Sequence, residues 1–243
     1  MPRWFRQLVG LAAALLKSSL RYRTMLVQLP IVALIPVYFA LVYRLSTAEL
    51  IQVLAGGVVS TGVWVATGVM QDVAYEREVY RFLEMLIASP MKPHVYLLAH
   101  VVASYLDAGL STIPLIALYA WASGSPLSPL WALAISALLT FTLAPLSGVI
   151  GLRMRSVKEV GALPSFISTL LVFIPPVYYP ASRLPEPLSY ASLAIPTVAA
   201  AEAFRGLTLG SSLIDPLILL GYLALLSAAA TGAAARLLDW RLD

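Results

Sequence analysis

The chain has 243 residues, of which 60% are apolar and only 12% are charged, and its formal net charge is +4. Soluble domains carry about 25% charged residues, so this composition excludes a soluble globular domain and indicates an integral membrane protein. Cysteine is absent, which excludes disulfide scaffolds, thiolate zinc sites, iron–sulfur centres and cysteine nucleophiles.

Residues 1–24 predict an amphipathic helix that lies in the membrane interface. At about 100° per residue, the apolar side chains share one side of this helix: Trp4, Phe5, Leu8, Leu11, Ala12, Leu15 and Leu16. The polar side chains share the other side: Arg3, Arg6, Gln7, Lys17 and Arg21. The alternative is a cleaved signal peptide, but further basic residues follow the apolar stretch and no convincing small-residue cleavage site is present.

Six later stretches have the length and apolarity of membrane spans. The hydrocarbon core of a bilayer is about 30 Å thick and needs roughly 20 apolar residues per helix. The stretches are residues 25–43, 50–70, 95–121, 130–152, 160–179 and 213–237. Residues 25–243 therefore predict a single six-span domain, and the predicted fold class is an all-α integral membrane protein.

The basic residues give this domain an orientation, because Lys and Arg are enriched in cytoplasmic loops. With the N-terminus inside, 13 of the 16 Lys and Arg residues fall in cytoplasmic segments, and the outer segments hold only Arg44, Arg183 and Arg205. We therefore predict that both termini are cytoplasmic. Nucleic acid is excluded as a partner, because the basic residues are distributed as a topology signal rather than clustered on a wettable face.

The loop between the second and third predicted spans has a helical pattern. Its apolar residues recur at helical spacing: Val79, Phe82, Leu83, Leu86 and Ile87. Charged residues lie largely off this stripe, and Glu78 is placed to pair with Arg81 three positions later: Glu76, Glu78, Arg81 and Glu84. Ser89 and Pro90 end the pattern. The sequence predicts one helix of three to four turns from Glu76 to Ser89, either an interfacial helix closing a loop or a lever moved by a soluble partner.

The segment after residue 174 combines prolines with continued apolarity. The prolines prevent one long regular helix: Pro175, Pro176, Pro180, Pro185, Pro187 and Pro196. Residues 188–204 nevertheless remain apolar. Non-helical backbone at membrane depth is tolerated where protein buries it or where it lines a cavity. We expect short, partly re-entrant helices here, since an ordinary extracellular loop would be more polar.

Few single residues suggest chemistry. Asp107 lies near the middle of the third predicted span, where a carboxylate is costly, and it is either a polar group on a conduit or a packing contact bonded to a neighbouring hydroxyl. His94 and His100 are six residues apart and lack carboxylate or thiolate co-ligands, so no metal site is expected. Ser147 has no buried histidine in its span to activate it, which argues against a membrane protease.

Two segments carry a family resemblance. The stretch EREVYRFLEMLIASPMKP resembles the motif after the second span of type-two permeases of ABC exporters. The later proline-rich bend, the LP pair at 184–185, IPT at 195–197 and EAFRG at 202–206 are similar to a second signature of that family. In this chain Tyr80, Arg81 and Phe82 replace the Gly-Thr that often precedes the Leu-Glu pair.

The resemblance implies a permease subunit that exports an amphipathic or lipid-like substrate from the cell across the plasma membrane. It implies pairing with a second permease copy, identical or different, within membrane lipid, and with cytoplasmic ATP-binding subunits. The coupling helix would comprise Glu76, Glu78, Val79, Arg81, Phe82, Leu83, Glu84, Leu86 and Ile87. The sequence has no G-x-x-x-x-G-K-[ST] loop, so ATP and Mg²⁺ are expected on the partner and this chain is expected to be no enzyme. A standalone secondary transporter or channel and a haem-exporter-like permease are the alternatives.

Overall fold

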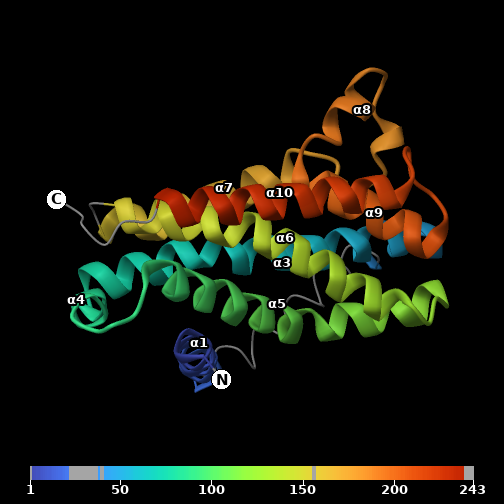
Figure 1. Ribbon diagram of the computed structural model, residues 1–243. Helices are drawn as coiled ribbons and strands as arrows, with labels where there is room; N and C mark the ends of the chain where they lie inside the picture. The colour runs from blue at the N-terminus through green and yellow to red at the C-terminus, as the bar shows by residue number, and fades with distance from the viewer. Residues whose placement is uncertain (1, 22–37, 39–40, 155–156, 238–243) are drawn as a thin grey trace.

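The computed structural model describes residues 2–21, 38, 41–154 and 157–237. Within these residues all regular structure is helical (Figure 1). The helices are α1 (Arg3–Arg21), α3 (Thr47–Glu78), α4 (Phe82–Ile87), α5 (Pro93–Ser123), α6 (Ser128–Arg153), α7 (Val157–Phe173), the 3-10 turn η1 (Ala181–Arg183), α8 (Leu188–Ser192), α9 (Pro196–Leu209) and α10 (Pro216–Leu237).

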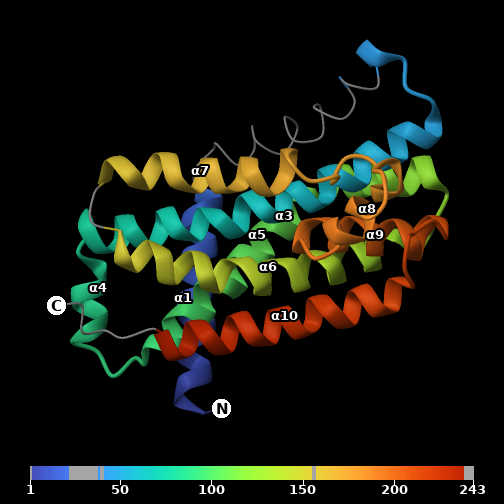
Figure 2. The same cartoon turned by 90° about the horizontal axis from the view of Figure 1, so that it is seen from above.

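Helix α3 lies at the centre of a bundle of long helices. It packs against α5, α6 and α7 along its length and against α9 near its start, and α10 packs on the far side of α6. Helix α4 lies at one end of the bundle, and α8 and α9 lie at the other (Figures 1 and 2). Helix α1 runs across the bundle and contacts α5, in contrast to the long helices, which run side by side.

Among the described residues, four helices are long and apolar enough to cross a membrane: α3, α5, α6 and α10. They contain the predicted spans 50–70, 95–121 and 130–152 and all but the first three residues of span 213–237. Helix α3 has 32 residues, which at 1.5 Å per residue is about 48 Å. This length exceeds the hydrocarbon core, so α3 projects beyond it. The predicted span 25–43 falls almost wholly outside the described residues.

The fifth predicted span is shorter than expected. Helix α7 ends at Phe173, whereas the hydropathy pattern predicted a span from 160 to 179. Pro175 and Pro176 explain the difference, because proline lacks the amide that a helix needs and disfavours helical geometry in the residue before it. The chain therefore leaves α7 early and enters the turn that leads to η1.

Apolar clusters hold the bundle together at both ends, and the two largest lie one at each end. The first joins α3, α6, α9 and α10 around fully buried residues such as Phe204, Leu139 and Leu223. The second joins α3, α5 and α6 to α4 and α1. Gly151 of α6 meets the backbone of Met70 so closely that a Cβ atom would collide with it, which sets the close approach of α3 and α6.

Helix α1 has the amphipathic division that its sequence predicts. Leu8, Leu11 and Ala12 are buried, whereas Arg3 and Arg6 are exposed. Trp4 and Phe5 lie on the predicted apolar side but are exposed in the described part of the chain. The crosswise course of α1 suits a helix in the interface, and its location in a membrane stays a prediction.

Candidate functional site

The segment between α3 and α5 differs from the single helix predicted over Glu76–Ser89. Helix α3 continues to Glu78, Arg81 adopts a left-handed conformation with φ of 49°, and α4 has only six residues. The prediction of a helix of three to four turns was therefore wrong. An apolar repeat cannot reveal such a break, because a left-handed residue can restart a helix with its apolar residues still facing the bundle.

The predicted apolar stripe divides between two environments. Leu83 and Leu86 are 4% and 8% exposed and pack in the apolar cluster shared with α1 and α5. Val79 and Ile87 are 50% and 48% exposed and face outward. Phe82 is partly buried against the same cluster. The buried leucines fix α4 to the bundle, and the outward residues leave it an apolar surface.

The charged residues of this end also pair differently from the prediction. Arg77 Nε lies 3.3 Å from Glu78 Oε1, and Arg81 Nε lies 4.0 Å from Glu84 Oε1, so the predicted Glu78–Arg81 pair is not formed. The break at Arg81 separates the two residues onto different helices. Arg81 and Glu84 have side chains that are 78% and 69% exposed. Exposed pairs of this kind contribute little to stability, so these charges remain accessible to a partner.

Glu76 instead holds α3 to α5. The Tyr96 hydroxyl donates a hydrogen bond to Glu76 Oε2 at 2.6 Å, and His100 Nε2 lies 3.1 Å from the same oxygen. His100 is 3% exposed. Arg77 donates a hydrogen bond to the carbonyl of Leu152 on α6. These contacts anchor the last turns of α3 to two neighbouring helices.

A groove of about 1130 Å³ runs along α3 and α5 beneath α1. Asp107, half-buried in the middle of α5, lines it together with Ser19 of α1. The Ser19 hydroxyl donates a hydrogen bond to Asp107 Oδ2 at 3.3 Å. The hydrogen bond from Ser19 agrees with the interpretation of Asp107 as a packing contact. Its position in the groove agrees with the interpretation of Asp107 as a conduit residue, so both alternatives stay open.

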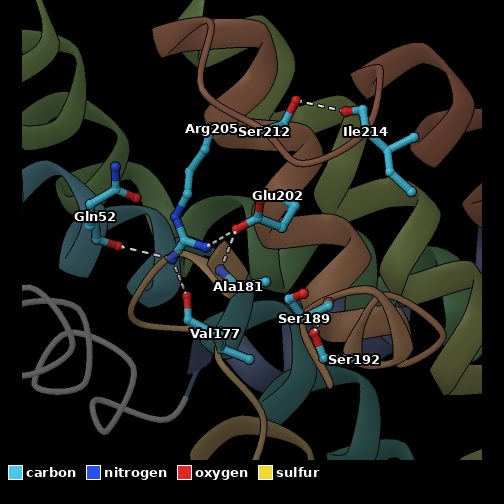
Figure 3. Close-up of polar contacts among 9 residues, drawn as sticks. All are labelled: Gln52, Val177, Ala181, Ser189, Ser192, Glu202, Arg205, Ser212 and Ile214. Carbon is cyan, nitrogen blue, oxygen red and sulfur yellow. Dashed lines mark hydrogen bonds and ion pairs between the residues drawn. The ribbon is translucent and has the colours of Figure 1, made fainter. Parts of the chain in front are cut away.

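The opposite end holds an ion pair that the sequence reasoning missed. Glu202 and Arg205 of α9 are 2% and 0% exposed, and Arg205 Nη1 donates to Glu202 Oε1 at 3.1 Å. The Ala181 amide also donates to Glu202 Oε1 at 3.1 Å, and Arg205 Nη2 donates to the carbonyls of Gln52, at 3.4 Å, and Val177. Figure 3 shows the side chains of Glu202 and Arg205 converging with the backbone of Gln52, Val177 and Ala181.

This buried pair ties together the start of α3, the turn after α7, η1 and α9. A buried charge is stable only when its partner and hydrogen bonds compensate for lost hydration. The signal for it lay in the sequence, since Glu202 and Arg205 are three residues apart within an otherwise apolar stretch. That spacing does not predict which distant backbone carbonyls accept hydrogen bonds from Arg205.

Comparison with known families places the chain. No curated protein gives a significant match. The family model described as ABC-2 type transporter matches residues 6–209, which include α1, the α3–α4 end and the buried pair, while α10 lies beyond the match. The four apolar helices agree with a multi-pass membrane protein. The chain therefore belongs to the ABC-2 type transporter family and is a transmembrane component of such a transporter.

Proposed function

We propose that the chain is the permease subunit of an ABC exporter and that the outward surface of α4 contacts a cytoplasmic ATP-binding subunit. The observation that carries this proposal is the form of α4, a short helix held to the bundle by Leu83 and Leu86. Glu84 and Ile87 of α4 face outward, together with Val79 and Arg81 just before it. A mixed apolar and charged surface of this kind is typical of a protein interface.

The distribution of basic residues supports a cytoplasmic location for the α4 end. Arg77, Arg81 and Lys92 flank α4 along the chain, and Arg153 and Arg236 end the helices α6 and α10. Both of those helices end at the α4 end of the bundle (Figure 2), and Leu152 and Ala234 belong to the same apolar cluster as Leu83 and Leu86. In membrane proteins the end of the bundle that is rich in Lys and Arg usually faces the cytoplasm.

The anchoring of α4 suggests how force reaches the membrane. Leu83 and Leu86 pack with α1 and α5, and Glu76 joins α3 to α5 just before the break. A push on α4 by an ATP-driven partner would therefore move α1, α3 and α5 together. ATP and Mg²⁺ belong to that partner, and this subunit transmits movement without catalysing hydrolysis.

The proposal also includes a second permease copy in the plasma membrane, with six spans and both termini cytoplasmic. Helices α7 and α10 present outward-facing apolar residues: Phe166, Phe173, Ile174, Leu217, Ile218 and Leu225. Exposed apolar surface on this scale suits contact with lipid and with another transmembrane subunit. A path between the two copies would carry an amphipathic substrate outward.

Reconstitution with the ATP-binding subunit that co-purifies from native membranes tests the proposal. We expect Ile87→Asp to abolish stimulation of ATP hydrolysis by the permease while membrane insertion is retained, because a buried charge at an interface is costly. Leu188→Asp is the matched control, since Leu188 is 57% exposed at the opposite end. Recovery of no ATP-binding subunit, together with transport that survives ATP depletion, would favour a secondary transporter or channel instead.

A further inference from the structure

The described lining of the groove beneath α1 is acidic apart from His100, which lies against Glu76. The described lining contains three carboxylates, Asp72 and Glu76 of α3 and Asp107 of α5, and contains no lysine or arginine. On α3 the lining runs from Gly57 to Glu76, which at 1.5 Å per residue is about 28 Å. The groove is therefore nearly as long as the hydrocarbon core is thick.

The carboxylates gather in the half of the groove nearest α4. Asp72 and Glu76 are one helical turn apart on α3. The hydrogen bond between His100 Nε2 and Glu76 Oε2 joins this part of α3 to α5, on which Asp107 lies seven residues after His100. Glu76 is engaged by Tyr96 and His100, and Asp107 accepts one bond from Ser19. Within the part of the chain that the structure describes, Asp72 makes no hydrogen bond or ion pair.

The other half of the groove is neutral, and aromatic side chains line it as they line the half near α4. Trp64, Phe173 and Tyr178 line the neutral half, and Trp64 and Phe173 are 41% and 61% exposed. Ser60 and Tyr178 satisfy each other through a hydrogen bond of 2.9 Å. The aromatic side chains here present uncharged ring faces to the groove. Such faces attract both cations and apolar groups.

We propose that this groove binds an organic cation with an apolar body, its charge between Asp72 and Asp107 and its body against Trp64, Phe173 and Tyr178. The proposal deepens the proposed function, because it rests on that function in taking the bound cation as the substrate. Ionisable residues within membrane spans face cavities of this kind and mark the pathways of substrates or ions. An anion would add to the repulsion among the carboxylates, so charge complementarity selects a cation.

The volume is compatible with such a ligand. Sites for drug-sized molecules enclose about 300–1,000 Å³, and this groove is slightly larger at about 1130 Å³. Its acidic half and its neutral half also match the two parts of an amphiphile. A flat patch of carboxylates would provide no such second contact, and it would bind small inorganic cations and bulky ones alike.

Two ions of nearly equal size and opposite charge test the proposal on the purified full-length protein in neutral-lipid nanodiscs. We expect saturable binding of radiolabelled tetraphenylphosphonium and none of tetraphenylborate, after subtraction of uptake by protein-free nanodiscs. Asp72→Asn and Asp107→Asn should each weaken tetraphenylphosphonium binding about tenfold, and Trp64→Ala should weaken it by a smaller factor. Glu186→Gln removes an exposed carboxylate outside the groove and should leave binding unchanged.

Equal binding of the two ions, or full binding by both asparagine variants, would overturn the proposal. The comparison of the two ions needs no variant, so it decides the question even if a variant fails to fold. The assay also contains no ATP-binding subunit. Loss of coupling with intact cation binding would therefore count against the proposed function alone, and ATP-driven transport of other substrates without cation binding would count against this inference alone.

Discussion

The two ends of the bundle use their charged residues in opposite ways. At the α9 end, Glu202 and Arg205 are fully buried and bind each other and the backbone of three other segments. At the α4 end, Arg81 and Glu84 lie 4.0 Å apart on the surface and are mostly exposed. Buried pairs fix one structure, whereas exposed pairs contribute little to it. The difference supports the proposal that the α4 end is the contact surface for a partner and that the α9 end is a fixed cap.

The largest expected effect is at the fixed cap. Arg205→Ala leaves the Glu202 carboxylate buried without its cation, which should lower the free energy of unfolding by about 3–5 kcal/mol. Denaturant unfolding of the purified protein in detergent measures this. Arg183→Gln is the matched control, because Arg183 lies at the same end and makes only an exposed contact of 4.0 Å with Glu49. Equal stability of the two variants would contradict the account of the cap.

The second prediction separates the inner and outer sides of α4. Leu83→Ala should cost about 2–5 kcal/mol, as is usual for a buried leucine, because Leu83 packs between α4 and the bundle. Ile87→Ala, on the outward side, should change stability by less than about 0.5 kcal/mol. The same unfolding assay checks both. If Ile87→Ala were as destabilising as Leu83→Ala, α4 would have no free surface for a partner.

The third prediction concerns the anchor just before α4. Tyr96→Phe removes the hydrogen bond of 2.6 Å to Glu76 and should cost about 1.5–3 kcal/mol, the usual range for a bond to a charged group. Tyr105→Phe is the control, since its hydroxyl makes only a marginal contact of 3.5 Å. An unchanged unfolding midpoint for Tyr96→Phe would show that the Tyr96–Glu76 hydrogen bond does not stabilise the contact between α3 and α5.

The smallest loss of stability is expected for a hydrogen bond between two neutral side chains, in the part of the bundle between its two ends. The hydroxyls of Thr67 and Ser168 lie 2.6 Å apart and are buried between α3 and α7. Ser168→Ala should cost about 1 kcal/mol in the unfolding assay, because neutral hydrogen bonds contribute less than charged ones. A loss as large as that of Arg205→Ala would mean that burial alone, rather than charge, distinguishes the cap.

The sequence predicted the long helices because the features that form a helix lie within one segment of the chain. Apolar stretches of span length lie in α3, α5, α6 and α10, and Pro93 at the start of α5 and Gly124 after its end mark boundaries that residue chemistry explains. The division of α1 into an apolar and a polar side was also predictable, since the spacing of residues within α1 is enough to define both sides.

The parts that could not be predicted depend on contacts between distant segments. After the left-handed Arg81, Leu83 and Leu86 join an apolar cluster that includes residues of α1, α3 and α5. A repeat within the loop contains no information about those partners. The Glu202–Arg205 pair reaches Gln52 and Val177, which lie far away in the sequence. The pairing of α1 with the groove likewise required the fold.

The most direct test of the central claim locates the ATP-binding subunit on the bundle. The chain contains no cysteine, so Ile87→Cys and Leu188→Cys each place a single thiol at one end. With a bifunctional thiol reagent in native membranes, the account predicts that Ile87→Cys becomes cross-linked to a protein identified by mass spectrometry as an ABC ATP-binding subunit, and that Leu188→Cys does not. Cross-linking of that subunit through Leu188→Cys, or through neither position, would contradict the assignment of α4 as the contact surface.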